Sequence, residues 1–144
     1  MYTNLLHLHN TLRWVILIVA AIVLIRSYSG WAGKRKWGKT ETRLGLVFSS
    51  VFYLQFLIGF VLYAFYSPLL KIAFADFGAA MKNAELRFIA VEHTTMMVFA
   101  LILVHLGQIR SKKANTDIKK HRTAAIFYSI ATILMLIAIP WGRL

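Results

Sequence analysis

The stretch ELRFIAVEHTTMMVFALILVHLGQIR, residues 85–110, carries the strongest structural signal in the chain. It is apolar and exceeds the roughly 20 residues that a helix needs to cross a bilayer. It also contains Glu92, His93 and His105 inside that apolar run. Ionisable side chains in a membrane span are energetically unfavourable and usually mark a functional site, and neutral imidazole is the commonest metal ligand. The stretch therefore predicts a transmembrane helix whose His93 holds a bound group.

Composition places the whole chain in the membrane. Its 144 residues are 59% hydrophobic, whereas roughly half of the residues of a soluble protein are apolar. Four spans of about 20 residues with short connections account for the entire length. We therefore expect an all-α protein with one integral membrane domain over residues 1–144. The expected spans are residues 5–27, 42–66, 85–110 and 123–141.

The lack of cysteine excludes several kinds of site, and the distribution of charge predicts the membrane topology. The chain has no cysteine, which excludes disulfides, Fe–S clusters, thiolate zinc sites and covalently attached haem. The net charge of +12 does not indicate a nucleic-acid partner, because residues 26–43 and 110–122 hold six Lys or Arg each, twelve of the seventeen. The positive-inside rule places both loops in the cytoplasm and both termini outside. The sequence thus predicts an up-down-up-down four-helix bundle in the lipid bilayer.

The segment between the second and third spans is expected to stay at the membrane surface. Ser67-Pro68 ends the second span, because a residue before proline is disfavoured in the helical region. The following LLKIAFADFGAAMKN is too short and too charged to cross again. Since proline suits the first turn of a helix, we predict a short interfacial helix with apolar side chains in lipid or over the mouth of the bundle. Those side chains are Leu69, Leu70, Ala73, Phe74 and Phe77.

Two spans carry ridges suited to close helix contact. Gln55, Gly59 and Tyr63 are four residues apart in the second span, so they share one face. Small residues on such a ridge let helix backbones approach closely. A second ridge, in the fourth span, consists of Ala124, Tyr128, Ala131 and Met135.

His9 and His93 are expected to meet at one depth in the membrane. His9 lies one to two turns inside the outer end of its span and His93 about two turns inside the outer end of its own. Side chains on facing helices build cofactor sites in bundles of this kind. Two neutral imidazoles on opposite sides are what the iron of a b-type haem needs. We therefore predict His9 and His93 as axial ligands of haem b. His7, which points about 160° away from His9, is the substitute for it.

The residues around His93 are expected to leave room for a planar macrocycle. Ala90, Met97 and Ala100 fall within about 60° of the direction of His93 on a helical wheel. Gly59 in the second span leaves similar room. These four residues are therefore candidates for contact with the haem ring.

Charged residues near the outer surface have two interpretations. Arg13 and Arg87 are placed to form charge-assisted pairs with haem propionates. We expect Glu92 to form an ion pair with Arg13 across the bundle, because such a pair neutralises two charges in the membrane at once. Glu92 could alternatively accept a proton from a quinol bound beside it.

His105 and His121 are the weaker candidates for a second haem. His105 follows His93 by twelve residues, which turns it about 120° away from the first ligand. His121 sits in the basic run KKHR. A solvated side chain or a contact with lipid headgroups is the preferred interpretation there.

Two other functions stay open. A histidine in a membrane span can hydrogen-bond a neighbouring helix, so the chain could be a haem-free accessory subunit of a larger membrane complex. Glu92 and Arg13 could instead serve a small quinone-binding or proton-handling protein. The sequence has no H-E-x-x-H zinc motif, catalytic triad or phosphate loop, so we expect an electron carrier rather than a hydrolase or transferase.

Several segments resemble a family of small four-helix bacterial membrane proteins known as cytochrome b or cytochrome b-like proteins. The segments are LLHLHNTLRWVIL, QFLIGFVLY followed by SP, MKNAELRFIAVEHTTMM, KKHRTAAIFY and IPW, which together cover nearly the whole chain. The resemblance implies a four-helix protein of the bacterial inner membrane that binds haem b and transfers electrons with quinol or a larger respiratory assembly.

The resemblance extends to individual residues of the expected site. The first-helix histidine pair and the VEH of the third helix match His7, His9, Glu92 and His93 here. One position departs from the family pattern, because Tyr53 stands where the family has a histidine, two residues before the glutamine. If that histidine is a ligand in the family, this chain lacks it.

Overall fold

The computed structural model describes residues 1–143, which form an all-helical protein. Four long helices are joined by two loops and by a series of short helices. Two elements, η1 and η2, are π-helical turns, and η3 is a 3₁₀ turn. The elements in order are α1 (Tyr2–Ala32), α2 (Lys39–Val61), η1 (Leu62–Tyr66), α3 (Pro68–Ala75), α4 (Phe77–Ala80), α5 (Ala84–Arg87), η2 (Phe88–Glu92), α6 (His93–Lys113), α7 (Asp117–Ala138) and η3 (Trp141–Arg143).

Four helical stretches are long and apolar enough to cross a membrane, which indicates a multi-pass membrane protein. They are Tyr2–Ala32, Lys39–Tyr66, Ala84–Lys113 and Asp117–Ala138. Their outward faces carry large apolar side chains that are more than half exposed, among them Ile18, Ile25, Leu57, Phe99 and Ile137. A surface of this kind suits lipid rather than water.

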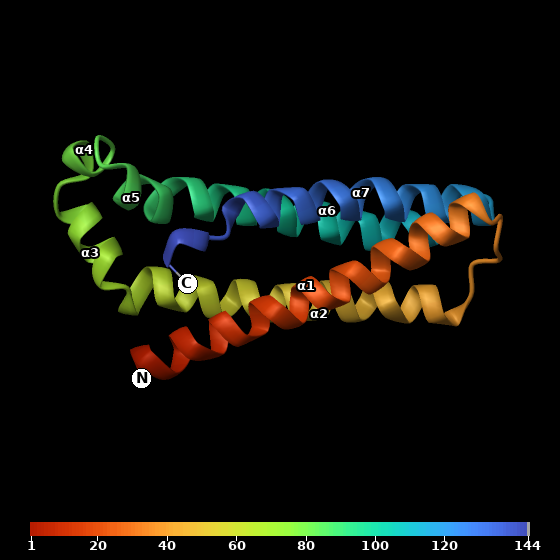
Figure 1. The fold of residues 1–144 in the computed structure, drawn as a ribbon, viewed down its shortest axis with the longest axis horizontal. Coiled ribbons are helices and arrows are strands. Elements are labelled where there is room, and N and C mark those ends of the chain that lie inside the picture. Colours follow the sequence, from red (N-terminus) through yellow and green to blue (C-terminus); the bar gives the residue numbers. More distant parts are fainter. Residues whose placement is uncertain (144) are drawn as a thin grey trace.

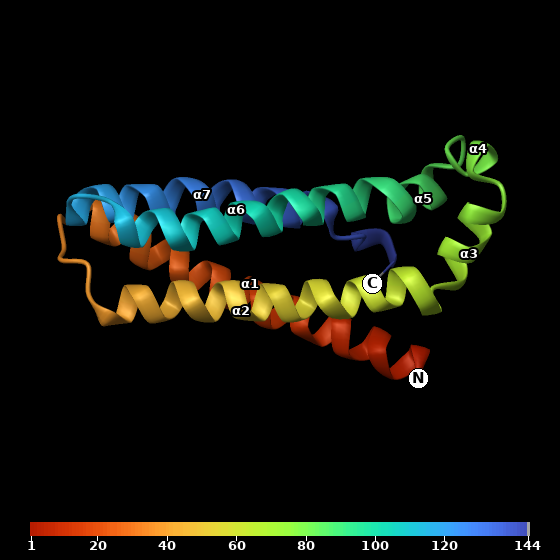
Figure 2. The ribbon, with the colours of Figure 1, turned by 180° about the vertical axis from the view of Figure 1, so that it is seen from behind.

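The four long helices form a closed ring of neighbours. α1 packs against α2 and α7, and α6 packs against the same two helices. α1 and α6 therefore occupy opposite corners of the bundle. Figures 1 and 2 show α1 running obliquely across α2. Both views place the α1–α2 and α6–α7 connections at one end, and the short helices with the N-terminus at the other.

The core is built from small residues and a few aromatic rings. The ridge of Ala124, Tyr128, Ala131 and Met135 is buried throughout, which confirms its predicted role in helix contact. The Tyr128 ring lies edge-on to Phe48, with ring centroids 5.2 Å apart. A Cβ atom added at Gly107 of α6 would lie 2.8 Å from the Cβ of Phe127 in α7. Glycine is therefore what lets these two backbones approach.

The helices extend beyond the predicted spans because polar residues cap them outside the apolar runs. α7 begins at Asp117 rather than near residue 123, and the Lys119 amide donates to Thr116 Oγ1 over 3.2 Å at its N-terminus. At α2, the Gly38 amide donates to the Glu41 carboxylate over 2.9 Å. Such caps satisfy amides that have no partner within a helix. Apolar content marks the membrane-crossing part of a helix, but not its ends.

The segment after η1 forms short helices, the first of which begins at the proline, as predicted. α3 begins at Pro68, directly after the extended residue Ser67. Leu70 and Ala73 face inward and pack with Ala80 and Ala90 in a small second cluster, so they cover the end of the bundle. Among the other apolar side chains of this segment, Phe74 and Phe77 are exposed and stack with ring centroids 5.8 Å apart.

Candidate functional site

His9 lies in α1 against the second helix. It is half-buried, and a Cβ atom at Gly59 of α2 would lie only 3.1 Å from its Cε1. The Gln55 side-chain amide donates to the His9 carbonyl oxygen over 2.7 Å. The predicted ridge of Gln55 and Gly59 therefore positions His9. The His9 Nδ1 atom is buried and makes no hydrogen bond within the part of the chain that the structure describes.

His93 lies in α6, at the corner of the bundle opposite α1, and is held by the neighbouring helix α7. It is the first residue of α6, and its Nδ1 lies 2.7 Å from the carbonyl oxygen of Ala138. Ala138 ends α7, so its carbonyl lies in the last turn, where the helix supplies no partner. A carbonyl can only accept, so His93 donates from Nδ1 and in its neutral form keeps a lone pair on Nε2. Histidines that bind metals are commonly oriented in this way.

His9 and His93 come from opposite corners of the bundle, because they belong to α1 and α6. The two side chains are near enough for their charges to influence each other, as are those of His9 and Arg13. His7 is exposed and lies apart from this pair, which follows from its different direction on the helix.

Arg13 lies beside His9 with an aromatic neighbour. Its Nη1 donates to the Asn10 side chain over 3.4 Å, and its guanidinium carbon lies 5.1 Å from the centre of the Trp14 ring. The Trp14 ring in turn lies edge-on to Trp141, with centroids 6.2 Å apart. The Nε atom of Arg13 is buried and makes no hydrogen bond to residues 1–143. This donor is available for an anionic group of a ligand.

The predicted ion pair between Glu92 and Arg13 is wrong. Glu92 pairs with Arg87, whose Nε lies 2.8 Å from the Glu92 carboxylate. The two residues are five positions apart across the π-helical turn η2, and a π turn places residues at that spacing next to each other. Arg87 also donates from Nη1 to the Met81 carbonyl over 3.1 Å. It is thus already engaged on two sides.

The three residues that were predicted to lie on the same face as His93 divide between two clusters. Ala90 packs beneath α3 and α4, whereas Ala100 lies in the main core and Met97 is half-buried beside that core. A helical wheel at a constant angle per residue placed these three on one face with His93. The π turn that precedes His93 changes the direction of Ala90 relative to His93, Met97 and Ala100, which all belong to the regular helix α6.

Two π turns lie side by side at the His9–His93 end of the bundle. The Tyr63 hydroxyl in η1 donates to the Ala90 carbonyl in η2 over 2.8 Å. π turns inside long helices occur frequently at functional sites. The sequence contains no signal that distinguishes them from ordinary helix, so sequence reasoning missed them.

His105 forms a separate polar pair. It is exposed and hydrogen-bonds through Nδ1 to the Tyr53 hydroxyl. Tyr53 therefore contacts one of the two histidines considered for a second haem. The pair faces outward between α2 and α6, twelve residues beyond His93 along the latter helix.

The expectation that His121 is solvated is wrong. Its side chain is 0% exposed, its Nε2 lies 3.0 Å from the Arg35 carbonyl oxygen, and its ring centroid is 5.2 Å from that of Trp37. Gly30 abuts the imidazole so closely that a Cβ atom there would collide with it. The α1–α2 loop folds over the start of α7, and a basic sequence run cannot reveal such a cover.

We expect His121 to stabilise the fold rather than bind a cofactor. Replacing His121 with alanine leaves a cavity and removes the partner of the Arg35 carbonyl, which should lower the free energy of unfolding by about 2–4 kcal/mol. Thermal denaturation in detergent measures this loss, with His7→Ala as an exposed control that should melt like the wild type. Loss of a bound chromophore in the folded His121→Ala protein would contradict a purely structural role.

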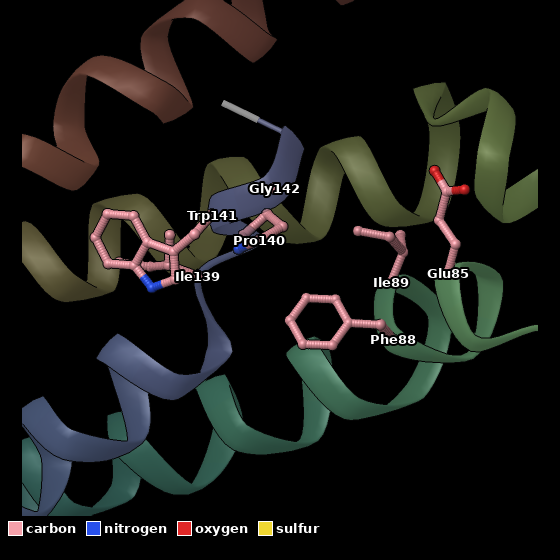
Figure 3. Close-up of a pocket in the computed structure, with 7 residues that line it drawn as sticks. All are labelled: Glu85, Phe88, Ile89, Ile139, Pro140, Trp141 and Gly142. Carbon is pink, nitrogen blue, oxygen red and sulfur yellow. The ribbon is translucent and has the colours of Figure 1, made fainter.

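A hollow of about 280 Å³, open to the surface, lies at the start of the third span. Figure 3 shows it between the start of the third span and the C-terminal segment. The Phe88 ring centroid lies 6.2 Å from that of His93, and Ile139 follows the residue that binds His93. The lining residues are Glu85, Phe88, Ile89, Ile139, Pro140, Trp141 and Gly142.

The donor set suits a haem better than a bare metal ion. No group of three or more His, Cys, Asp or Glu side chains in residues 1–143 could hold a metal ion, whereas a low-spin haem iron takes only two ligands from the protein. The buried His9 nitrogen and the oriented His93 ring fit such a group, whereas the room expected at Gly59 is taken up by the His9 ring itself. Comparisons with protein-family models, with curated proteins and with solved structures gave no match.

Proposed function

We propose that this protein binds one b-type haem between His9 and His93 and transfers electrons in the membrane. The observation that supports the proposal is that two histidines from opposite corners of the bundle, near enough for their charges to influence each other, each keep a nitrogen for a ligand. When bound, the haem iron supplies one-electron chemistry. His7 remains the substitute ligand, but its exposure makes it the weaker candidate.

The residues around this pair have distinct proposed tasks. Ala138 orients His93 through its carbonyl, and Gly59 keeps space beside His9. Arg13, with its unpaired Nε, is the better candidate for a propionate. Arg87 is the weaker one, because it already pairs with Glu92.

We infer a membrane orientation from charge. Each of the connections at residues 26–43 and 110–122 holds six Lys or Arg, and both connections lie at the same end of the bundle. The positive-inside rule then places that end in the cytoplasm of a bacterium and both termini on the outer side of the inner membrane. The four helices would cross in up-down-up-down order, with α3 at the outer interface as its exposed Ile72 and Phe74 favour.

Electrons would come from a quinol or pass to other subunits of a respiratory assembly. The hydrogen-bonded pair of Tyr53 and His105 supports a subunit partner. Both side chains are exposed on a face that otherwise suits lipid, and polar side chains in a membrane rarely face lipid alone. A helix of another subunit could cover them.

The direct test is the absorption spectrum of the protein purified from haem-sufficient bacterial cells. We expect a Soret band, sharp α and β bands on reduction, and a pyridine haemochrome assay that gives one haem b per chain. Protein that is folded and free of haem and iron would instead support a haem-free accessory subunit. Quinone extracted with organic solvent from haem-free protein would support a small quinone-binding protein.

A further inference from the structure

We propose that the α1–α2 loop and the start of α7 together bind the headgroup of an anionic phospholipid. Each of the two segments supplies three cations to what we call the loop surface. This proposal depends neither on haem binding nor on which side of the membrane the surface faces. The six cations are Lys34, Arg35, Lys36, Lys119, Lys120 and Arg122.

A buried histidine holds the two segments of the loop surface together. His121 Nε2 lies 3.0 Å from the carbonyl oxygen of Arg35, although the two residues are 86 positions apart. A carbonyl can only accept, so the imidazole donates and fixes the loop on α7. The Trp37 ring covers the same imidazole, with 5.2 Å between the centroids. Cations from distant parts of the sequence therefore share one surface.

The loop backbone takes an unfavourable conformation at one of these cations. Lys34 has a φ of 51°, and it is the one non-glycine residue with a positive φ in the part of the chain that the structure describes. The Arg35 amide donates to the Gly30 carbonyl over 3.0 Å and so closes the end of α1 around Lys34. Glycine is the usual residue at such a position, because a side chain is disfavoured there. A lysine kept in this conformation indicates that its charge serves a function.

The cations of the loop surface lack acidic partners. Neither of the two ion pairs found in residues 1–143 includes one of them. Of the acids at this end of the bundle, Glu41 is bound by Arg26 over 2.7 Å, and Asp117 lies in the first turn of α7, where the helix dipole favours a negative charge. Five of the six cations are exposed. Because like charges on one surface repel each other, an anionic partner would stabilise the arrangement.

The surroundings of the loop surface fit a lipid better than a soluble anion. Arg122, Ile126 and Ile130 are four residues apart and share one face of α7, and the two isoleucines are 45% and 46% exposed. On α1, the Tyr28 ring stacks on Trp31 with centroids 6.2 Å apart, and such aromatic residues are typical of the headgroup level. A cation at the end of an exposed apolar stripe matches the phosphate and acyl chains of a phospholipid. A net negative headgroup is favoured, because the amine of a zwitterionic headgroup offsets its phosphate.

The preference is measured by quenching of tryptophan fluorescence with brominated lipids in bilayers that contain the full-length protein. Trp14→Phe and Trp141→Phe leave Trp31 and Trp37 as reporters at the loop surface. The probes are brominated phosphatidylglycerol, which is anionic, and brominated phosphatidylcholine, which is zwitterionic. We expect phosphatidylglycerol to bind at least roughly fivefold more tightly. The preference should decline in about 1 M NaCl, where charges are screened over about 3 Å.

Two double variants separate this surface from the general positive charge of the protein. Lys36→Gln with Arg122→Gln removes one exposed cation from each segment of the loop surface. Arg110→Gln with Lys112→Gln is the matched control, because it removes the same charge from exposed residues of the α6 end. We expect the first variant to bind the two lipids within roughly twofold of each other, and the control to keep the wild-type preference.

Lys34→Gly tests whether the strained lysine is kept for its charge. Glycine adopts a positive φ without steric cost, so the melting temperature in an uncharged detergent should rise. The preference for phosphatidylglycerol should fall, because one cation of the loop surface is lost. A melting temperature below that of the wild type would show instead that Lys34 serves the fold.

Two results with the lipid probes would overturn the proposal. If the wild-type protein bound both lipids equally, the cations would be left for an acidic protein partner. If both double variants lost the preference to the same extent, the attraction would come from diffuse charge and not from the surface that His121 assembles. His93→Ala should retain the full preference, so the lipid site and the proposed haem site succeed or fail separately.

Discussion

His93→Ala is expected to abolish haem binding, with the Soret band falling to the baseline of haem-free protein. Alanine removes the imidazole that the Ala138 carbonyl holds in place over 2.7 Å, and with it one of the two proposed haem ligands. His9→Ala should have a similar effect, because His9 is the other proposed ligand, in the helix at the opposite corner of the bundle. The measurement is haem per chain by pyridine haemochrome on protein that elutes as a single folded species.

His7→Ala is the matched control for this experiment. His7 is two residues from His9 on the same helix, yet it is exposed, so its loss should leave haem content unchanged. Circular dichroism separates ligand loss from misfolding, because the helices do not depend on His93 for their formation. A His93→Ala protein that keeps a full, unshifted Soret band would remove His93 from the site. Loss of haem in His7→Ala alone would make His7 the ligand in α1.

Gly107→Leu is expected to cause a large loss of stability. A Cβ atom at Gly107 would lie 2.8 Å from the Phe127 Cβ and 2.8 Å from Tyr128 Cε1. The Phe127 Cβ is fixed to the backbone of α7 and cannot swing away, so α6 and α7 must separate. Overpacking of this kind costs about 1–3 kcal/mol or more, which corresponds to a melting temperature lower by roughly 5–10 °C.

Ala21→Leu provides the comparison for Gly107→Leu. Ala21 is exposed on α1, so a leucine there extends into lipid and should change the free energy of unfolding by less than about 0.5 kcal/mol. Melting in the same detergent, followed by circular dichroism, compares the two. Equal melting temperatures would show that α6 and α7 do not meet closely at this point.

The sequence predicted contact ridges better than it predicted contact partners. The Gln55, Gly59 and Tyr63 face was expected to contact another helix, and Gln55 and Gly59 do contact His9. Spacing along one helix shows which residues share a face, but it carries no information on which helix lies opposite. The identity of His9 as the partner follows only from the crossing of α1 over α2.

Two errors have the same kind of cause. Glu92 was paired with Arg13 because such a pair would neutralise two charges in the membrane, and the π turn places it beside Arg87 instead. His121 was assigned to solvent because its neighbours in sequence are basic, and the α1–α2 loop buried it beneath Trp37. A local change of helix type decided the contact of Glu92, and a loop distant in sequence decided that of His121. Neither feature can be read from the residues next to them in the chain.

The sequence by itself determined that the chain has four apolar helices, where they are interrupted, and which faces of them carry small residues. These properties follow from the identity of neighbouring residues, because apolar length and helical spacing are local. Only the tertiary structure decided that His9 lies against Gly59, that Ala138 orients His93, and that a hollow opens beside Phe88. Those features depend on how helices far apart in the chain cross and where their ends lie, and no local pattern encodes either.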